Sequence, residues 1–345
     1  MKHVLEMTVP EFSAEMARLG GKGFRARQIA QWAWKRHAES FDEMTDLPAA
    51  QRQRLYDEGF RLRTARRVHR ADSADGTVKC LLELADGETV ECVAIPAARR
   101  LTACVSTQVG CAMGCAFCAT GLSGWKRNCS SGEVVEQVFH LQSAAGERVS
   151  HVVFMGMGEP LANYGATVAA VRAMVDPERL GLSARHVTVS TVGLPKQIRR
   201  LAAEGLPITL AISLHAPTDS LRARLMPAAT RYPLAEVLAA AEAFFQARRR
   251  EVTLEYVVLP GINDTKPCAE ALSRIARRLR CNVNLIGYNP VPSLPFERPD
   301  EATVEAFAAR LRRQGVRAQV RRSRGLDVAG ACGQLRQTAA PARAR

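Results

Sequence analysis

The sequence predicts an α/β fold in which a partial barrel of six βα units follows an N-terminal helical accessory domain and a short β-hairpin extension. From residue 101 onward, apolar strand-like runs alternate with helical patterns, which is typical of a parallel sheet with right-handed crossovers. The 345 residues are 47% apolar and 24% charged, which suits one large domain that carries a smaller one.

Residues 1–75 are expected to form the helical accessory domain. A capped helix start is indicated at Thr8-Val-Pro-Glu11, and apolar periodicity predicts further helices over 26–37 and 47–56. Residues 76–100 are expected to form the hairpin extension. Its two alternating runs, 77–84 and 88–95, flank an Asp-Gly pair that is typical of a tight turn.

Residues 101–337 are expected to form the barrel, together with a C-terminal cysteine loop. The apolar runs that we interpret as strands are 101–108, 150–155, 186–191, 208–214, 251–258, 282–287 and 316–320. The helical patterns between them cover 132–144, 164–175, 194–203, 233–248, 266–279 and 300–313. Residues 338–345 form an Ala/Arg tail that we expect to be disordered.

Membrane and secreted classes are disfavoured by the hydropathy of the chain. No window approaches the roughly 18 uninterrupted apolar residues that a membrane helix needs. The N-terminal residues lack the apolar stretch of a signal peptide. We therefore expect a cytoplasmic protein with no membrane partner.

The balance of charge is strongly basic, with 48 Lys and Arg against 34 Asp and Glu, a net charge of +14. A soluble surface that happens to be basic is one explanation. A polyanionic partner is the other, because arginine forks pair bidentately with phosphate and the arginines are clustered. One cluster comprises Arg61, Arg63, Arg66, Arg67 and Arg70. The other comprises Arg310, Arg312, Arg313, Arg317, Arg321, Arg322 and Arg324, with no carboxylate in the sequence between Glu305 and Asp327.

Three of the ten cysteines, Cys111, Cys115 and Cys118, lie within eight residues of one glycine-bearing loop. A 4Fe–4S cluster normally takes four thiolates, so three leave one iron open to a small molecule that must receive an electron. Buried structural cysteines and a structural zinc site are the alternatives, although zinc usually takes four Cys or His ligands.

Polar or glycine-rich motifs follow five of the predicted strands, and such motifs meet at the carboxyl ends of parallel strands. These motifs are the cysteine loop, the run 156–160, Ser190, the run 213–215 and Asn289. We therefore expect one site at this edge of the sheet.

The cysteine spacing, with an aromatic residue before the third cysteine, resembles that of the radical S-adenosylmethionine superfamily. The run Gly156-Met-Gly158-Glu159-Pro160 matches it as well. The resemblance implies a radical SAM partial barrel and a cluster whose open iron binds the methionyl group of S-adenosylmethionine. It also implies cleavage of that cofactor to a 5′-deoxyadenosyl radical. Gly158 and Glu159 would then hold the cofactor's amino group.

The residues 103–111 and Ala331-Cys332-Gly333-Gln334-Leu335 narrow the resemblance to the RNA adenine methyltransferases of the dual-specificity type. The supporting matches are Gly23-Phe-Arg-Ala-Arg-Gln28, Arg127-Asn128, Ser190-Thr191-Val192-Gly193, Gly261-Ile-Asn263-Asp264 and Tyr288-Asn289-Pro290. This resemblance covers about residues 9–337. It implies methylation of adenine C2 in 23S ribosomal RNA and in transfer RNA, although a close relative methylates C8. Gly287, Trp125 and Cys129 depart from the family pattern and leave room for a shifted RNA target.

The resemblance also implies roles for two further cysteines and a carboxylate. An adenine carbon is a poor nucleophile, so Cys332 would take a methyl group from one S-adenosylmethionine and a second molecule would supply the radical. Cys104 would resolve the RNA adduct through a transient disulfide with Cys332. Glu91 would accept the ring proton, although a lone strand Glu is more often an exposed carboxylate.

The remaining implications concern the cofactor contacts and the partners. Ser190, Ser213, Leu214, His215 and Asn289 would contact S-adenosylmethionine, although Ser190 could equally cap a helix. The partners would be 23S ribosomal RNA, transfer RNA and a flavodoxin-like electron donor, and we expect a monomer.

Five cysteines in apolar patterns are interpreted as core or incidental, namely Cys80, Cys92, Cys129, Cys268 and Cys281. A non-catalytic RNA-binding protein with a structural cluster or zinc is the competing interpretation.

Overall fold

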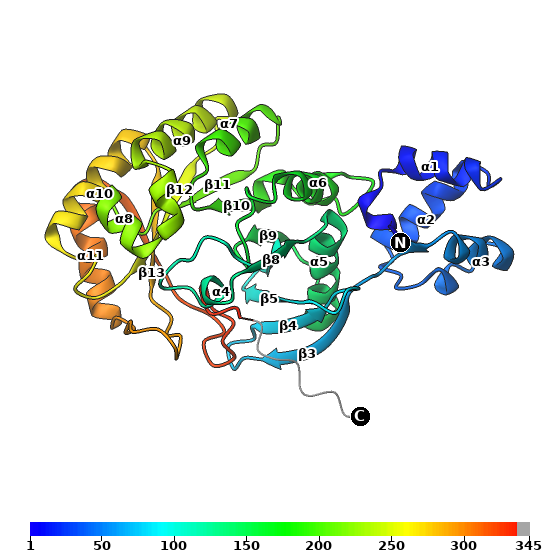
Figure 1. Ribbon diagram of the computed structural model, residues 1–345, viewed down its shortest axis with the longest axis horizontal. Helices are drawn as coiled ribbons and strands as arrows, with labels where there is room; N and C mark the ends of the chain where they lie inside the picture. Colours follow the sequence, from blue (N-terminus) through cyan, green and yellow to red (C-terminus); the bar gives the residue numbers. More distant parts are fainter. Residues whose placement is uncertain (337–345) are drawn as a thin grey trace.

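The computed structural model describes residues 1–336, so the tail expected to be disordered, 338–345, lies outside the described residues. A ten-stranded sheet runs through the molecule in the order β14-β13-β12-β11-β10-β9-β6-β5-β4-β3 (Figure 1). Its strands are β3 (Arg66–Asp72), β4 (Val78–Glu83), β5 (Thr89–Ala97), β6 (Arg100–Cys104), β9 (His151–Phe154), β10 (Val187–Thr191), β11 (Thr209–Ser213), β12 (Val252–Val258), β13 (Asn282–Gly287) and β14 (Arg317–Arg321). The sheet has two edges and is therefore an open, partial barrel.

The seven strands from β6 to β14 are parallel and follow one another in chain order. One principal helix crosses between each neighbouring pair and lies on the outer side of the sheet (Figure 1). These helices are α5 (Ser131–Ala145), α6 (Tyr164–Val175), α7 (Pro195–Ala203), α9 (Leu234–Arg248), α10 (Lys266–Leu279) and α11 (Glu301–Arg313). The expected partial (βα)6 barrel is confirmed. A short helix α8 (Asp219–Leu225) between β11 and α9 was not expected.

Local sequence explains where the crossover helices begin and end. Ser130 and Glu133 form a capping box at the start of α5, and the left-handed Gly146 ends that helix. Asp300 caps α11 by accepting the backbone N–H of Thr303 at 2.6 Å. No helix in the described residues is long and apolar enough to cross a membrane.

The N-terminal helices form a separate unit beside α5 and α6 (Figure 1). They are α1 (Val9–Arg18), α2 (Phe24–Trp34) and α3 (Ala49–Asp57), and α1 starts at the expected capping box of Thr8 and Glu11. The buried Glu136 of α5 ties this unit to the barrel. Its carboxylate accepts the backbone N–H of Ala65 at 2.7 Å and lies 2.9 Å from Nε2 of His3.

The expected hairpin is present as β4 and β5, but the sheet continues one strand further than predicted. Residues 66–72, which were expected within the helical domain, form the edge strand β3 and pair antiparallel with β4. This strand carries the polar sequence Arg-Arg-Val-His-Arg-Ala-Asp and is mostly exposed. An exposed edge strand lacks the apolar alternation that reveals a half-buried one, which explains the error.

The first predicted barrel strand, 101–108, is divided in the structure. After β6 the chain leaves the sheet, and β7 (Gln108–Gly110) pairs antiparallel with β8 (Trp125–Asn128). The loop between these two strands carries the three clustered cysteines and the short helix α4 (Ala119–Leu122). The Cys111 N–H donates to the carbonyl oxygen of Gly124 at 2.7 Å, so the two ends of the loop lie side by side.

Candidate active site

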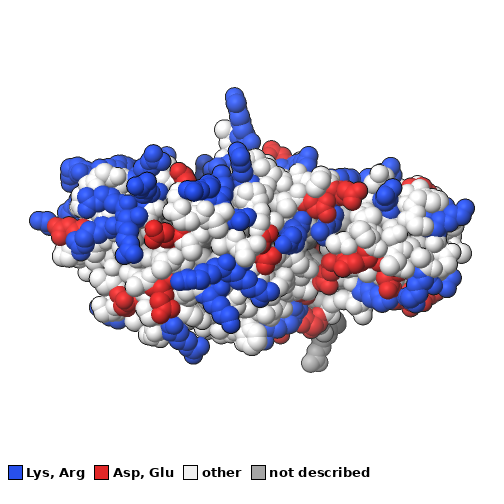
Figure 2. Space-filling view, turned by 90° about the horizontal axis from the view of Figure 1, so that it is seen from above, with Lys and Arg blue, Asp and Glu red and all other residues white. Residues whose placement is uncertain are grey.

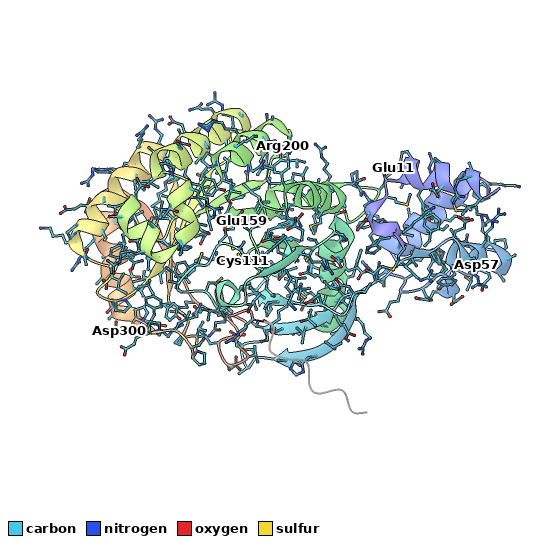
Figure 3. The ribbon with its side chains drawn as sticks, viewed as in Figure 1. Glu11, Asp57, Cys111, Glu159, Arg200 and Asp300 are labelled. Atoms are coloured by element: carbon cyan, nitrogen blue, oxygen red, sulfur yellow. The ribbon has the colours of Figure 1, made fainter. Side chains whose placement is uncertain are left out.

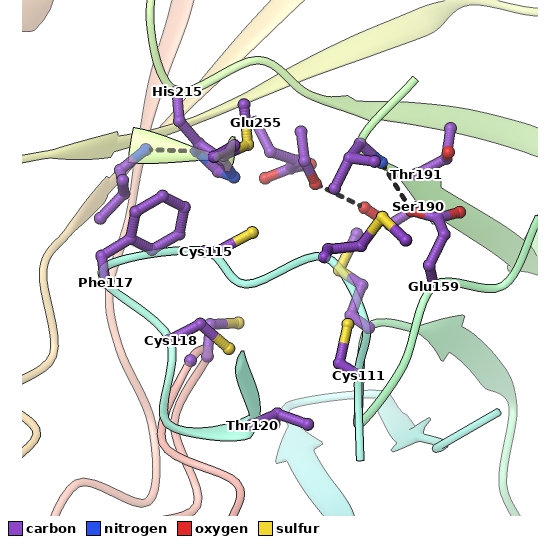
Figure 4. A pocket seen from close by; sticks show the side chains of 18 of the residues that line it. Cys111, Cys115, Phe117, Cys118, Thr120, Glu159, Ser190, Thr191, His215 and Glu255 are labelled. Atoms are coloured by element: carbon purple, nitrogen blue, oxygen red, sulfur yellow. Dashed lines mark hydrogen bonds between the residues drawn. The ribbon is translucent and has the colours of Figure 1, made fainter. Parts of the chain in front are cut away.

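A pocket lies at the carboxyl ends of the parallel strands, where the sequence motifs were expected to meet (Figure 4). Its walls come from the cysteine loop, the segment after β9, the ends of β10 to β13 and the C-terminal segment. Cys111 and Glu159 mark its position inside the barrel, far from Glu11 and Asp57 in the N-terminal unit (Figure 3). The motifs after five different strands therefore share one cavity.

Cys111, Cys115 and Cys118 all line this pocket (Figure 4). Burial raises the pKa of Cys111 to about 12 and raises that of Cys115 well above its ordinary value. Thiols of this kind become thiolates when they bind a metal cation. Among residues 1–336, no three His, Cys, Asp or Glu side chains converge to hold a single metal ion. Three thiols spread around one pocket fit a larger group, such as an iron–sulfur cluster held by its separate irons.

The segment after β9 brings Gly158 and Glu159 to the pocket. Gly158 has φ of +99°, and a Cβ there would lie 2.6 Å from Cβ of Gln108, so the turn requires glycine. The Glu159 carboxylate is 2% exposed and accepts the backbone N–H groups of Leu161 and Val192 at 2.9 and 2.8 Å. Burial raises the pKa of Glu159 to about 7, although these hydrogen bonds oppose the shift.

Ser190, next to the last residue of β10, and Ser213, the last residue of β11, lie on adjacent strands at the pocket wall, with their hydroxyl oxygens 3.2 Å apart. Leu214, which was predicted to contact the cofactor, is fully buried and does not line the pocket. Of the run 213–215, only the serine and the histidine therefore reach the cavity.

His215 is a neutral hydrogen-bonding group in this pocket. Its Nδ1 accepts the backbone N–H of Val257 at 3.0 Å, so the ring proton resides on Nε2. Burial, together with the nearby Arg222, lowers the pKa of His215 to about 3. Its backbone is left-handed, with φ of +52°, and its ring packs edge-on against Phe117. His215 therefore brings one N–H donor, Nε2, to the lining of the pocket.

Asn289 joins the pocket to the C-terminal segment. Its side-chain amide donates to the carbonyl oxygen of Cys332 at 3.0 Å, and its Oδ1 accepts from Arg298 at 2.7 Å. Because both ends of the amide are engaged, the side chain is fixed in orientation.

Cys104 and Cys332, 228 residues apart in the sequence, line a second pocket. Cys332 also lines the first pocket, as do Met155, Ile286 and Asn289. Cys104 is buried and Cys332 is exposed, and both are free thiols. Burial raises the pKa of the Cys104 thiol above its ordinary value, and the neighbouring Arg321 opposes part of this shift. Cys332 therefore stands at the wall that the two pockets share.

Glu91 does not line either pocket, and it is not the exposed carboxylate that a lone strand Glu usually is. It is 1% exposed and lies 3.2 Å from Nζ of Lys79, and it accepts the backbone N–H of Arg336 at 2.7 Å. In the register of β5 and β6, Val93 lies opposite Cys104. Side chains two residues apart on a strand share a face, so Glu91 and Cys104 are on the same side of the sheet.

Two residues of the site were not foreseen from the sequence. Glu255 of β12 is 4% exposed and lines the first pocket, where its carboxylate accepts from Asn284 at 2.9 Å. Arg321 of β14 lines the second pocket and lies 3.5 Å from Glu255. The strand position of Glu255 was the available signal, since a carboxylate inside a predicted buried strand needs a partner.

Several arginines of the two clusters form ion pairs in the structure, so fewer of them are available to a polyanionic partner than the sequence indicates. Acidic side chains, some close in sequence and others from distant segments, form ion pairs with several of these arginines, and the face seen in Figure 2 mixes both signs of charge. The ion pairs are Arg66–Glu83, Arg70–Asp72, Arg312–Glu305, Arg317–Glu251, Arg321–Glu255 and Arg324–Asp75. In the C-terminal cluster, Arg310, Arg313 and Arg322 form no ion pair among the described residues. Arg310 and Arg313 line a groove together with Lys266 and Glu270.

Of the other five cysteines, which were expected to be core or incidental, Cys80, Cys92, Cys129 and Cys281 are buried and Cys268 is partly buried.

Two family models match this chain. Residues 105–269 match the model of the radical SAM superfamily. Residues 2–59 match the N-terminal domain of ribosomal RNA large subunit methyltransferases.

Individual relatives match over nearly the whole chain. A protein of Thermosynechococcus vestitus, named "Probable dual-specificity RNA methyltransferase RlmN", is 46% identical over 97% of this chain and 98% of its own length. A protein of the same name from Gloeobacter violaceus is 48% identical over 96% of both chains. The crystal structure of a radical SAM methyltransferase from Sphaerobacter thermophilus superposes with a TM-score of 0.94, at 43% identity over 97% of this chain and 99% of that one.

Proposed function

Because the chain belongs to the RlmN family of dual-specificity RNA methyltransferases, within the radical SAM superfamily, we propose that it methylates C2 of adenosine in two RNAs. These are 23S ribosomal RNA, at the peptidyl-transferase centre, and transfer RNA, at the adenosine 3′ of the anticodon. The chain is accordingly an enzyme rather than a non-catalytic RNA-binding protein. One observation carries the proposal: Cys332 stands between the pocket of the three loop cysteines and the pocket of Cys104.

The radical SAM family implies a 4Fe–4S cluster and S-adenosylmethionine. In the proposal, Cys111, Cys115 and Cys118 hold the cluster and leave one iron for the cofactor. When bound and reduced, the cluster supplies the electron that cleaves S-adenosylmethionine to a radical. The groups that would hold the cofactor are Gly158, Glu159, Ser190, Ser213, His215 and Asn289. We do not assign Leu214 a side-chain contact, because it is buried outside the cavity.

In this proposal the thiols of Cys332 and Cys104 have different catalytic roles. The Cys332 thiolate would attack the methyl carbon of one S-adenosylmethionine. The bond from that carbon to the sulfonium sulfur would break, and S-adenosylhomocysteine would leave. The S-methyl group of Cys332 would lose a hydrogen atom to the radical derived from a second S-adenosylmethionine, and its methylene carbon would then bond to C2 of the adenine. The Cys104 thiolate would then attack the sulfur of Cys332, so that the disulfide forms as the S–C bond of the adduct breaks. The released carbon would take a proton to become the C2 methyl group, and the one electron left after loss of the ring proton would return to the cluster. The shared pocket wall allows Cys332 to face both partners.

Glu91 is proposed as the base that accepts the proton from the adenine ring. Its position on the same sheet face as Cys104 supports this role. Its carboxylate is covered by the Arg336 N–H and by Lys79, so residues 331–336 have to move before it can reach a substrate. Burial raises the pKa of Glu91, which makes its carboxylate a stronger base than that of an exposed glutamate.

RNA contacts are proposed for the N-terminal domain, residues 1–75, and for the unpaired arginines of the C-terminal cluster. The match of residues 2–59 to a ribosomal RNA methyltransferase domain supports the first of these. The net charge of +14 supports both. The target adenine is splayed out of its stack to reach the cavity. We further propose a monomer that works in the cytoplasm with a flavodoxin-like electron donor.

The test is methylation by the purified, anaerobically reconstituted protein. Fragments of 23S ribosomal RNA and transfer RNA are incubated with S-adenosylmethionine and a reductant, and the nucleosides are analysed by mass spectrometry. The proposal predicts 2-methyladenosine in both RNAs. Formation of 8-methyladenosine would contradict the C2 assignment, and modification of one RNA alone would contradict dual specificity.

A further inference from the structure

The segment that carries Cys332, residues 322–336, contains no helix or strand, so specific contacts must hold it in place. The contacts at its C-terminal end are those of the candidate site. The carbonyl oxygen of Gly333 accepts the Ala119 N–H at 2.7 Å, and that of Leu335 accepts from the Thr120 hydroxyl at 2.5 Å. This end of the segment is thereby attached to helix α4, directly after the cysteine loop.

The N-terminal end of the segment is held by a different part of the molecule, the turn between β3 and β4. The Asp327 carboxylate accepts from the Ser73 hydroxyl at 2.5 Å and from the Ala74 N–H at 3.0 Å. In return, the Asp75 carboxylate accepts the Gly325 N–H at 3.0 Å. We call this reciprocal contact between Asp75 and Asp327, with the groups they bind, the clasp.

The hydrogen bonds of the clasp fix how the two loops are aligned with each other. Each aspartate accepts a backbone N–H of the other loop, and ionised acceptors make the stronger class of hydrogen bond. Burial opposes ionisation of Asp75, but hydrogen bonds from Thr77 and Gly325 lower its pKa to about 2. Hydrogen bonds from Ser73 and Ala74 lower the pKa of Asp327 as well. Both carboxylates are therefore charged at neutral pH.

We propose that Asp75 and Asp327 are positioning residues that hold Cys332 at the wall between the two pockets. The inference rests on the proposed function, in which Cys332 must meet first the cofactor and then Cys104. Cys332 lies eleven positions after Arg321, the last residue of β14, but only five positions after Asp327. On its other side, Cys332 is still held by Asn289 and by the Gly333 contact. Because the probability of loop closure falls as about the 3/2 power of length, opening the clasp should weaken the restraint from the N-terminal side, and with it the local concentration of Cys332, by at most about threefold.

The first experiment measures hydrogen–deuterium exchange in the purified protein without RNA, comparing wild type with Asp75→Ala and Asp327→Ala. Both variants should exchange peptides from residues 328–336 faster than wild type, by up to about threefold. Asp72→Ala is the matched control, because Asp72 is an exposed carboxylate of β3 whose ion pair is with Arg70. Exchange at the wild-type rate in both clasp variants, or equally fast exchange in the control, would overturn the proposal.

The second experiment measures methylation of Cys332 by mass spectrometry after reconstitution with S-adenosylmethionine. Both clasp variants should methylate Cys332 more slowly, by up to about threefold, while their affinity for RNA is unchanged. Asp327→Asn, which keeps one oxygen acceptor, should recover part of the rate. A loss confined to RNA affinity, or no recovery in Asp327→Asn, would refute a positioning role. Because exchange needs no substrate, failure of the clasp is distinguishable from failure of the proposed function.

Discussion

Replacing Gly110 with alanine should separate β7 from β8 at the base of the cysteine loop. Gly110 has φ of +77°, and a Cβ there would lie 2.0 Å from the carbonyl oxygen of Gly124. The same oxygen accepts the Cys111 N–H, so the change disturbs the position of the first loop cysteine. Gly114→Ala is the matched control, since Gly114 has φ of +63° but no atom within 4 Å of its Cβ position.

The expected loss of stability follows from these contacts. Both variants place an L-residue in left-handed backbone, which costs about 1–2 kcal/mol. Gly110→Ala additionally loses a backbone hydrogen bond worth about 1 kcal/mol and forces a backbone shift that costs about 1–3 kcal/mol. Gly110→Ala should therefore be about 2–4 kcal/mol less stable than Gly114→Ala, a difference of about 4–8 °C in Tm at roughly 2 °C per kcal/mol.

Differential scanning calorimetry of both variants measures this difference directly. Iron and sulfide content after anaerobic reconstitution supplies a second reading, and we expect less iron in Gly110→Ala than in wild type. If both variants melt at the same temperature, the close approach of Gly110 to Gly124 does not anchor the loop and the reasoning is refuted.

Three further predictions concern burial, hydrogen bonding and charge. The raised pKa of Glu91 means that it stabilises the fold below about pH 4.5 and that this contribution is lost as pH rises through its folded pKa. The stability of Glu91→Gln relative to wild type should therefore improve between pH 4.5 and 7.5 in denaturant titrations, and a constant difference would contradict this. His215→Phe leaves the Val257 N–H without its acceptor and should cost about 1–3 kcal/mol in the same titrations, whereas no loss would argue against the bond. RNA affinity should fall with salt, with a logarithmic slope of about −0.9 or −0.7 for each phosphate contact, and salt-independent binding in a fluorescence titration would exclude a charge-based interface.

The order of the strands and helices in the barrel could be predicted because each of them depends on a local sequence pattern. Each βα unit has its own apolar strand and amphipathic helix, and right-handed crossovers leave little freedom in how the units are arranged. The convergence of the strand-end motifs follows from the same rule, which is why Ser190 and His215 reach one cavity. The edge strand β3 could not be predicted in this way, because neither of its faces is consistently buried.

Most of the structural features that could not be predicted from the sequence depend on contacts between distant segments. The burial of Glu91 depends on Arg336, 245 residues later in the chain. The arginine cluster near the C-terminus has no carboxylate within it, between Glu305 and Asp327, yet Glu251, Glu255 and Asp75 reach it in space. A single sequence carries no local signal for such pairs.

The central claim is that Cys332 carries the methyl group and that Cys104 releases the product. It is tested most directly by isolating Cys104→Ala and Cys332→Ala from cells and measuring covalently bound RNA by nuclease digestion and mass spectrometry. We predict that Cys104→Ala carries an RNA fragment on Cys332, because no thiol can displace its sulfur, and that Cys332→Ala carries neither RNA nor a methyl group. An RNA-free Cys104→Ala protein with normal turnover would contradict the account.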